Sequence, residues 1–223
     1  MVASLRAELD LDLDLAVDAP VEAAAAARHL GKRAFDVVVA ASLLVLTLPV
    51  LLACALAVRL GDGGPVLFRQ RRVGLGGREF TMVKLRTMVA DAERLVLDLT
   101  DRNIADGLLF KVEGDPRVTT VGRFLRRTCL DELPQLWNVL KGDMSLVGPR
   151  PLPVRAEEFR GRDAGRHAVR PGLTGPWQVA GGPRVPYRQM IDLDLAYIEG
   201  WTLRRDLALL VRTVPAVCGR SHW

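Results

Sequence analysis

Cysteine and lysine are both scarce in this sequence of 223 residues. The three cysteines, Cys54, Cys129 and Cys218, lie far apart and lack the paired short spacings of a structural zinc site or a disulfide framework. Their pattern excludes a small fold held together by metal or disulfides and suits a reducing cytosolic compartment. The length allows one domain with a substantial core, or one domain plus a membrane segment.

Lysine supplies only four of the 31 basic residues, which leaves 27 arginines. Arginine is suited to bidentate phosphate contacts, although a surplus of it can also reflect genome composition. Residues 1–30 hold six acids against two arginines, a net charge of −4, so the rest of the chain carries +9. A basic body implies an anionic partner, which could be nucleic acid, a lipid headgroup surface or a phosphorylated substrate.

Charge is absent from the 22 residues between Val37 and Val58, a run whose length and hydropathy predict a membrane helix. A buried core helix of this length would show polar residues on one face. The preceding residues, 1–31, show neither a strong core pattern nor a targeting pattern, so we expect a flexible acidic leader there.

Two features of the apolar run predict a re-entrant helix over residues 32–60. Pro49 lies near its middle, where it disrupts helical hydrogen bonding, and the Thr47 hydroxyl can satisfy freed carbonyl groups. Basic residues flank both ends: Lys32 and Arg33 before the run, and Arg59, Arg69, Arg71 and Arg72 after it. Because positive residues mark the cytoplasmic side, we expect both ends there, with the helix breaking at Pro49. A kinked helix that spans the membrane is the alternative.

Residues 61–223 are expected to form one cytosolic domain, mainly α with small β elements. Residues 61–88 contain strand-like pieces, and their glycine cluster lacks the P-loop and Rossmann spacings, which favours a hairpin turn over a phosphate loop. Residues 152–186 are loop by composition. A final amphipathic helix, from Leu203 to Val214 and ended by Pro215, either packs on the domain or lies on the membrane surface.

The stretch from Thr128 to Pro151 is the strongest candidate for chemistry. Its apolar residues recur at helical spacing before Gly142: Leu133, Leu136, Trp137 and Leu140. This pattern predicts a short helix from Glu132 to Lys141. Pro134 is tolerated in the first turn, which places Asp131 and Glu132 at the helix N-terminus. Asp131 should share a polar edge with Gln135 and Asn138.

The acid pair has two interpretations. Asp131 can cap the helix while Glu132 complements its dipole. Alternatively, the positive helix end keeps a reactive carboxylate ionised and also attracts phosphate. Arg126 and Arg127 precede the pair, and Arg150 follows it between two prolines. These arginines could form a plain salt-bridge cluster, or a site in which they hold phosphate while an acid reacts.

Several motifs occur in order along residues 32–220: Lys32-Arg33 with Asp36, Phe68-Arg69-Gln70, Gly77-Arg78, Lys84 to Met88, Leu130 to Gln135, Gly148 to Pro151, and Arg170 to Val179. Together they resemble the bacterial sugar transferases, also called monotopic phosphoglycosyl transferases, and the likeness is most specific around Asp131 and Arg150. The tail, with Tyr197-Ile198-Glu199 and Thr213-Val214-Pro215, resembles the hexose-type exopolysaccharide members.

The resemblance implies transfer of a sugar 1-phosphate from a nucleotide diphosphate sugar, with a UDP-hexose expected, to a polyprenyl phosphate. It places the enzyme at the bacterial inner membrane with its active site on the cytosolic face. It implies Asp131 as nucleophile, Glu132 as its partner and Mg²⁺ held by both acids. The implied phosphate or nucleotide ligands are Arg126, Arg150, Lys84 and Arg86. Membrane lipids and a second copy of the chain are further expected partners, and nucleic acid is not.

Elementary chemistry supports these roles. A carboxylate can attack phosphorus and form an acyl phosphate, which splits one transfer into two easier ones. Magnesium would neutralise the diphosphate that otherwise repels Asp131. The flanking prolines stiffen Arg150, so its guanidinium can meet phosphate at low entropic cost. The sequence departs from the family pattern at Cys129, at Leu85 and at residues 181–186. The departure at residues 181–186 is expected to affect only the choice of substrate.

Two other classes of protein remain as alternatives. A membrane-anchored scaffold with a basic lipid-binding surface would use the acid pair as a helix cap and would release no nucleotide. A basic nucleic-acid binder would show strongly salt-dependent DNA binding, but it leaves the apolar run unexplained.

Overall fold

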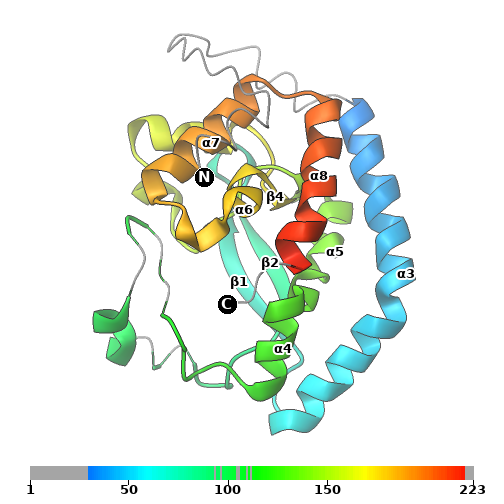
Figure 1. Ribbon diagram of the computed structural model, residues 1–223, viewed down its shortest axis with the longest axis vertical. Coiled ribbons are helices and arrows are strands. Elements are labelled where there is room, and N and C mark those ends of the chain that lie inside the picture. The colour runs from blue at the N-terminus through cyan, green and yellow to red at the C-terminus, as the bar shows by residue number, and fades with distance from the viewer. Residues whose placement is uncertain are drawn as a thin grey trace.

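The computed structural model describes residues 30–218 except positions 93, 96, 104, 105, 109 and 111. The leader expected over residues 1–31 therefore falls almost wholly outside the described residues. The described part of the chain is mainly helical with two small two-stranded sheets, which confirms the α+β prediction. Figure 1 shows one long helix, α3 (Leu30–Asp62), along one side of the other elements.

Helix α3 carries the apolar run. Its most apolar 18 residues have a mean hydropathy of 2.7 and only 11% of them are buried, so by length and composition the helix could cross a membrane. Large side chains on it are open to the surroundings, for example Val45 and Leu46, which are 74% and 75% exposed. Since exposed apolar surface of this extent is unfavourable in water, membrane association is the natural explanation.

The predicted break of α3 at Pro49 is not observed. The helix continues through Pro49 for its full 33 residues, and Figure 1 shows it bending near its middle. The Thr47 hydroxyl donates to the Leu43 carbonyl at 2.7 Å, not to the Val45 carbonyl that Pro49 leaves without its helical donor. A proline in a long helix can thus bend it without separating it into two.

Strands β1 (Leu67–Val73) and β2 (Glu79–Leu85) form the predicted hairpin. They pair antiparallel from Leu67 opposite Leu85 to Val73 opposite Glu79. The turn between them contains a 3₁₀ turn, η1 (Leu75–Gly77), in which Gly76 and Gly77 have φ values of 64° and 76°. Glycine adopts this left-handed conformation at no steric cost. The glycine cluster therefore serves the hairpin, as the sequence favoured.

The rest of the described chain is built from short elements. In order they are η2 (Leu97–Arg102), α4 (Thr120–Thr128), η3 (Leu130–Glu132), α5 (Gln135–Lys141), β3 (Ser145–Val147), η4 (Ala156–Glu158), η5 (Gly161–Ala168), β4 (Gly172–Thr174), α6 (Pro176–Ala180), η6 (Gly182–Arg184), α7 (Tyr187–Glu199) and α8 (Leu203–Cys218). Strands β3 and β4 pair in parallel. The prediction of loop for residues 152–186 was therefore wrong in part, because short helical turns and one strand lie within it.

Helix α8 continues past Pro215, which was expected to end it. The helix contacts α4, α6, β3 and β4, and these contacts support its last turn despite the missing proline N–H. Leu209 packs into the core, whereas Leu207, Val211 and Val214 are 46%, 71% and 64% exposed. The interpretation that this helix packs on the domain is therefore confirmed for one face, and its position on a membrane surface stays a prediction for the other, which is apolar and open.

The main core joins the first half of α3 to the elements around the acid pair. Its buried members are Ala40, Leu136, Val139, Met144, Leu146, Val147, Val169, Tyr197, Ile198 and Leu209. Burial of each large apolar side chain contributes about 1.5–3 kcal/mol. The apolar helix is therefore part of the folded domain and not a tether attached to it.

Polar contacts fix the N-terminal end of α3. Lys32 Nζ lies 2.6 Å from an Asp206 carboxylate oxygen in α8, and both side chains are buried. Tyr197 and Trp201 also donate to Asp206, at 2.7 Å and 3.1 Å. Arg33 donates to the carbonyl groups of Val139 and Leu140, at the C-terminal end of α5. Positive charge at a helix C-terminus is favourable, so Lys32 and Arg33 help to hold the domain together.

The C-terminal end of α3 is fixed to the same domain. Cys54 and Val58 are buried against Leu85 and Leu125. Arg86 forms an ion pair with Asp62 in the last turn of the helix. Both ends of α3 therefore contact one folded body.

We expect Asp206→Asn to lower the free energy of unfolding by about 3 kcal/mol, because it removes the nearer counter-charge of the buried Lys32 ammonium and leaves only Asp36, at 3.9 Å. Thermal unfolding in detergent measures the effect. Asp192→Asn is the matched control, since the Asp192–Arg162 pair is largely exposed and is worth no more than about 1 kcal/mol. Equal effects of the two substitutions would contradict the structural role of Asp206.

Candidate active site

The acid pair follows a sharp turn between two helices. The Thr119 hydroxyl caps the start of α4 by accepting from the Gly122 N–H, and the helix ends at Thr128. Cys129 then adopts the left-handed conformation, with φ of 54°, and among the described residues no other non-glycine residue has a positive φ. This conformation is uncommon for a residue with a Cβ atom and is typical of functional sites when it occurs.

Asp131 and Glu132 lie in the 3₁₀ turn η3, and α5 starts only at Gln135. The predicted start at Glu132 was therefore three residues early, and neither acid caps α5, which has no side-chain cap. The expected polar edge is also different. Gln135 and Asn138 are buried, and the Asn138 amide bonds to the backbone of Val83 and Thr81 in β2. This side chain positions the hairpin against α5.

Glu132 is bound by two of the predicted cations. Its carboxylate accepts from Arg150 at 2.6 Å and 3.2 Å and from Lys84 at 2.9 Å. Burial alone would raise the pKa of Glu132, but Arg150 and Lys84 hold it well below its usual range. Glu132 therefore stays ionised and fixed, as an anchor for the two cations.

Asp131 lies in a different environment from its neighbour. It is 6% exposed, and burial followed by the charge of Glu132 raises its pKa, against the opposing influence of Lys84, Arg126 and Arg150. Among residues 30–218 that the structure describes, none donates a hydrogen bond to this carboxylate. A buried acid with a raised pKa and no fixed partner, beside several cations, is a candidate for reaction.

Arg126 belongs to the same group. Its Nε donates to the Thr87 hydroxyl at 2.8 Å. Burial lowers the pKa of Arg126, and Asp131 is the strongest opposing influence. The structure thus brings Arg126, Arg150 and Lys84 around the acid pair, as the sequence predicted.

Arg86 was expected to bind phosphate or nucleotide, but its contacts lie elsewhere. Its guanidinium forms the ion pair with Asp62, and its Nε donates to the Pro65 carbonyl at 2.6 Å. The side chain is 6% exposed. The chain turns sharply after α3, and a cation is needed there to hold Asp62, so the structure gives Arg86 a structural role.

Sequence reasoning missed Arg72 as a member of the site. Arg72 donates to the Pro151 carbonyl at 2.8 Å and to the Gln70 side chain at 2.6 Å. Burial, together with the charge of Arg150, lowers the pKa of Arg72 to about 9. Gln70 and Arg72 are two residues apart on a strand and so share one face, and this alternation was the available signal.

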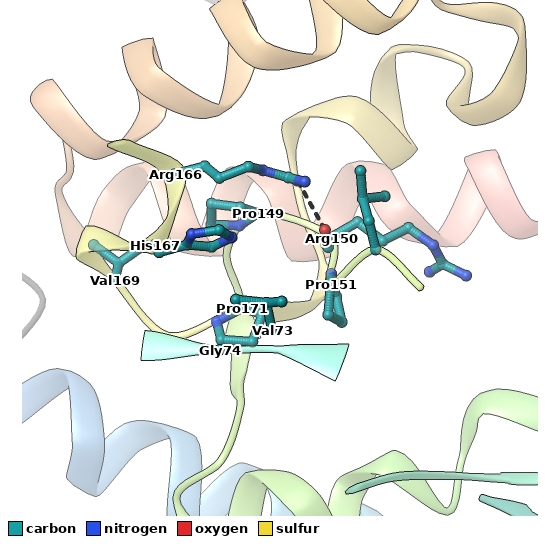
Figure 2. A pocket seen from close by; sticks show the side chains of 10 residues that line it. Val73, Gly74, Pro149, Arg150, Pro151, Arg166, His167, Val169 and Pro171 are labelled. Atoms are coloured by element: carbon teal, nitrogen blue, oxygen red, sulfur yellow. Dashed lines mark hydrogen bonds between the residues drawn. The ribbon is translucent and has the colours of Figure 1, made fainter. Parts of the chain in front are cut away.

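A buried ion pair supports the backbone of Arg150. Arg166 and Asp194 are almost fully buried and lie 2.6 Å apart. Figure 2 shows Arg166 donating to the Arg150 carbonyl, at 2.8 Å, while the Arg150 side chain extends away on the other side. Arg150 is therefore held by Arg166 as well as by Pro149 and Pro151. Sequence reasoning did not predict this contact, because Asp194 lies within an otherwise ordinary amphipathic helix.

The donor set at the acid pair fits Mg²⁺ only when substrate phosphate supplies most of the ligands. Among the described residues there is no group of three or more histidine, cysteine or acidic side chains that could hold a metal ion. Asp131 offers a carboxylate without a hydrogen-bond donor, whereas Glu132 is already neutralised by two cations. Magnesium characteristically binds one or two carboxylates plus phosphate oxygens and water.

Buried acids surrounded by cations beside an apolar helix define a class of enzyme that handles phosphorylated substrates near a membrane. Residues 27–220 of the chain match the family of bacterial sugar transferases. The chain belongs to this family and is a phosphoglycosyl transferase.

The chain matches different shares of its relatives' lengths. The chain is 46% identical over 205 residues to the UDP-glucose:undecaprenyl-phosphate glucose-1-phosphate transferase of Caulobacter vibrioides, covering 84% of this chain and 70% of that protein. It is 39% identical over 196 residues to the exopolysaccharide production protein ExoY of Sinorhizobium fredii, covering 85% and 86%. It is 44% identical over 158 residues to the galactosyl transferase CpsE of Streptococcus agalactiae, covering 70% of this chain and 35% of that protein. Membership of an enzyme family removes the scaffold and nucleic-acid alternatives as descriptions of the class.

We expect Glu132→Gln to destabilise the protein most at neutral pH, by about 3 kcal/mol, because it leaves Arg150 and Lys84 without their counter-charge. Since the folded-state pKa of Glu132 is depressed, its contribution is present above its ordinary pKa and is lost as pH falls through the folded value. The difference between wild type and variant should therefore shrink in acid. Unfolding measured from pH 7 down to pH 3 checks this.

Glu79→Gln is the control for this pH series, since the Glu79–Arg71 pair is exposed. Its effect should stay within about 1 kcal/mol at every pH. A constant difference between wild type and Glu132→Gln across the series would contradict the assignment of Glu132 as the ionised anchor.

Proposed function

We propose that this enzyme transfers a sugar 1-phosphate from a UDP-hexose to a polyprenyl phosphate and so starts an exopolysaccharide or glycoconjugate. The observation that carries the proposal is the division of roles between Asp131 and Glu132, with one acid unpaired and the other fixed by cations. The activities named for the relatives support the substrate class, since they include glucose and galactose transfer to undecaprenyl phosphate. Glucose and galactose are thus the two sugars to compare first.

In the first step a carboxylate oxygen of Asp131 attacks the phosphorus that carries the sugar. A bond forms between this oxygen and phosphorus, the diphosphate P–O bond breaks, and UMP leaves with the bridging oxygen. In the second step an oxygen of polyprenyl phosphate attacks the same phosphorus and releases Asp131. The product is a polyprenyl diphosphate sugar, and splitting the transfer makes each displacement easier.

The neighbouring side chains supply positive charge where phosphate must enter. In the proposal Arg126 and Arg150 contact the phosphate oxygens, and the bonds from Arg150 and Lys84 to Glu132 support this by holding the two cations in position. Preorganised cations in a buried site stabilise developing charge more than water does. When Mg²⁺ is bound, Asp131 would hold it together with the diphosphate, because Glu132 is already paired with Arg150 and Lys84, and the ion would neutralise the negative charge that repels the nucleophile.

The nucleophile can be tested through the covalent intermediate. Incubation with UDP-glucose or UDP-galactose, without acceptor, should give a protein whose mass is increased by a hexose phosphate. Asp131→Asn should lose the adduct and reduce UMP release by about a thousandfold or more. Asp192→Asn, at a partly exposed position in an ion pair with Arg162, should retain both. Undiminished adduct in Asp131→Asn would show that another residue is the nucleophile.

We also propose that α3 enters the inner membrane from the cytosolic face and returns to that face without crossing. Both ends of the helix contact the same domain, through Lys32 with Asp206 at one end and Asp62 with Arg86 at the other. A rigid domain cannot lie on both sides of a bilayer, and the bend in α3 keeps the two ends toward it. The apolar middle would then lie within the membrane while the site remains at the headgroup level.

Cysteine labelling tests this topology. Leu30 and Leu60 are 88% and 75% exposed at the two ends of α3. In a cysteine-free background, Leu30→Cys and Leu60→Cys should both react with a membrane-impermeant maleimide in inverted vesicles and not in intact spheroplasts, because both ends lie in the cytosol. Labelling of the two positions from opposite sides would instead support a spanning helix.

A further inference from the structure

An apolar cavity of about 290 Å³ lies beside the acid pair. Its walls include Leu43 of α3, the residues around Leu130 and Leu133, and the C-terminal half of α8 with Ala216 and Val217, and strands β3 and β4 and helix α6 complete them. Glu132 and Arg150 also line it. The cavity therefore connects the charged site with the two helices that carry exposed apolar surface.

The arrangement of α3 and α8 explains why a cavity is present. Their N-terminal ends are joined by the Lys32–Asp206 pair, and Figure 1 shows the two helices diverging from that point. The Thr213 and Thr174 hydroxyl groups lie 2.7 Å apart and hold α8 against β4. The space between the helices is thus bounded at one end by an ion pair and along one wall by a fixed helix.

The lining selects an apolar ligand with a charged end. Most of the wall is aliphatic, with Leu130, Leu173 and Leu210 among its members, so burying an apolar chain against it is favourable. The volume is about twice the roughly 150 Å³ of an apolar protein cavity that binds benzene, which has six carbons. About two five-carbon isoprene units would therefore fit, with a phosphate at the Arg150 end.

Resting on the proposed function, we infer that the cavity between α3 and α8 binds the first isoprene units of the polyprenyl phosphate acceptor. The C-terminal half of α8 is the wall that selects the polyprenyl group. The phosphate then lies beside Arg150, within reach of the sugar phosphate on Asp131. Leu43 of the apolar helix α3 lines the cavity, so the remaining isoprene units would continue along this helix into the bilayer. A phospholipid acyl chain would fit the same lining, but it would block the second step.

Filling the cavity should separate the two half-reactions. Ala216 lines the cavity, whereas Ala208 lies on the same helix with its side chain exposed. Ala216→Phe should leave the donor half-reaction intact, measured as the covalent adduct and UMP release without acceptor, because that step needs no polyprenyl chain. It should raise KM for a long-chain polyprenyl phosphate about tenfold, as the chain is displaced. Ala208→Phe should change neither.

Acceptor length gives a second readout. Wild type should use acceptors of two or more isoprene units better than a one-unit acceptor, and Ala216→Phe should lose that preference. Val217→Phe is a second substitution in the cavity wall and should cause the same loss of acceptor-length preference. If Ala216→Phe forms no adduct, Val217→Phe serves as the test variant in its place. If these variants form the adduct normally and keep the wild-type KM for long acceptors, the inference is overturned. This holds even if the variants lose a phospholipid that co-purifies with wild type, because the cavity would then bind phospholipid and not the acceptor. Absence of adduct in wild type would instead overturn the proposed function.

Photo-crosslinking of unmodified protein provides an independent arm. A polyprenyl phosphate with a diazirine in its second isoprene unit should crosslink to residues 210–217. Excess unlabelled polyprenyl phosphate should suppress the crosslink, and excess phospholipid should not. Crosslinks confined to the exposed face of α3, or suppressed equally by phospholipid, would overturn the placement of the acceptor.

Discussion

The pairing of Glu132 with Arg150 and Lys84 is the interaction on which the site depends. It joins strand β2, the turn η3 and the segment after β3 through bonds of 2.6 to 3.2 Å. Buried charges are unfavourable unless they are paired, so the two cations are held where Glu132 lies. Because Glu132 satisfies them, the adjacent Asp131 is left without a fixed donor. Two neighbouring acids of similar chemistry thereby acquire different roles.

A second buried network relates the site to the membrane helix. Asp206 accepts from Lys32, Tyr197 and Trp201, which come from α3, α7 and the chain just before α8. The same core that contains the start of α3 contains Leu136 and Val139 of α5, directly after the acid pair. The position of the acid pair relative to the apolar helix is therefore set by packing and ion pairing within one body, which is what the proposed reaction between a lipid phosphate and a water-soluble nucleotide sugar needs.

Helix α8 has one face in the core and another face open, and its C-terminal half also lines the apolar cavity. A helix that only covered the domain would bury its aliphatic side chains more completely. In the proposed scheme the open face contacts lipid while the cavity wall contacts the acceptor chain. Donor and acceptor would then approach the acid pair from different sides, the nucleotide sugar from water and the acceptor from the bilayer.

Local patterns in the sequence determined several features of this protein. The uncharged run between Val37 and Val58 specified an apolar helix, and the glycine turn at 74–77 specified a hairpin, because each depends on residues close together in the chain. The order of acidic and basic motifs around Asp131 and Arg150 was sufficient to indicate the family and the reactive region.

Tertiary structure decided the roles of individual charges. Arg86 pairs with Asp62 at a separation of 24 residues, while Arg72 reaches the Pro151 carbonyl across 79 residues. Composition and periodicity carry no information about such distant partners, so the sequence assigned Arg86 to the substrate and overlooked Arg72. Continuity of α3 through Pro49 and of α8 through Pro215 likewise depends on packing outside each helix. The sequence by itself determined the apolar helix, the hairpin and the family, and the tertiary structure decided which cation meets which acid, because burial forces charges to pair across the fold.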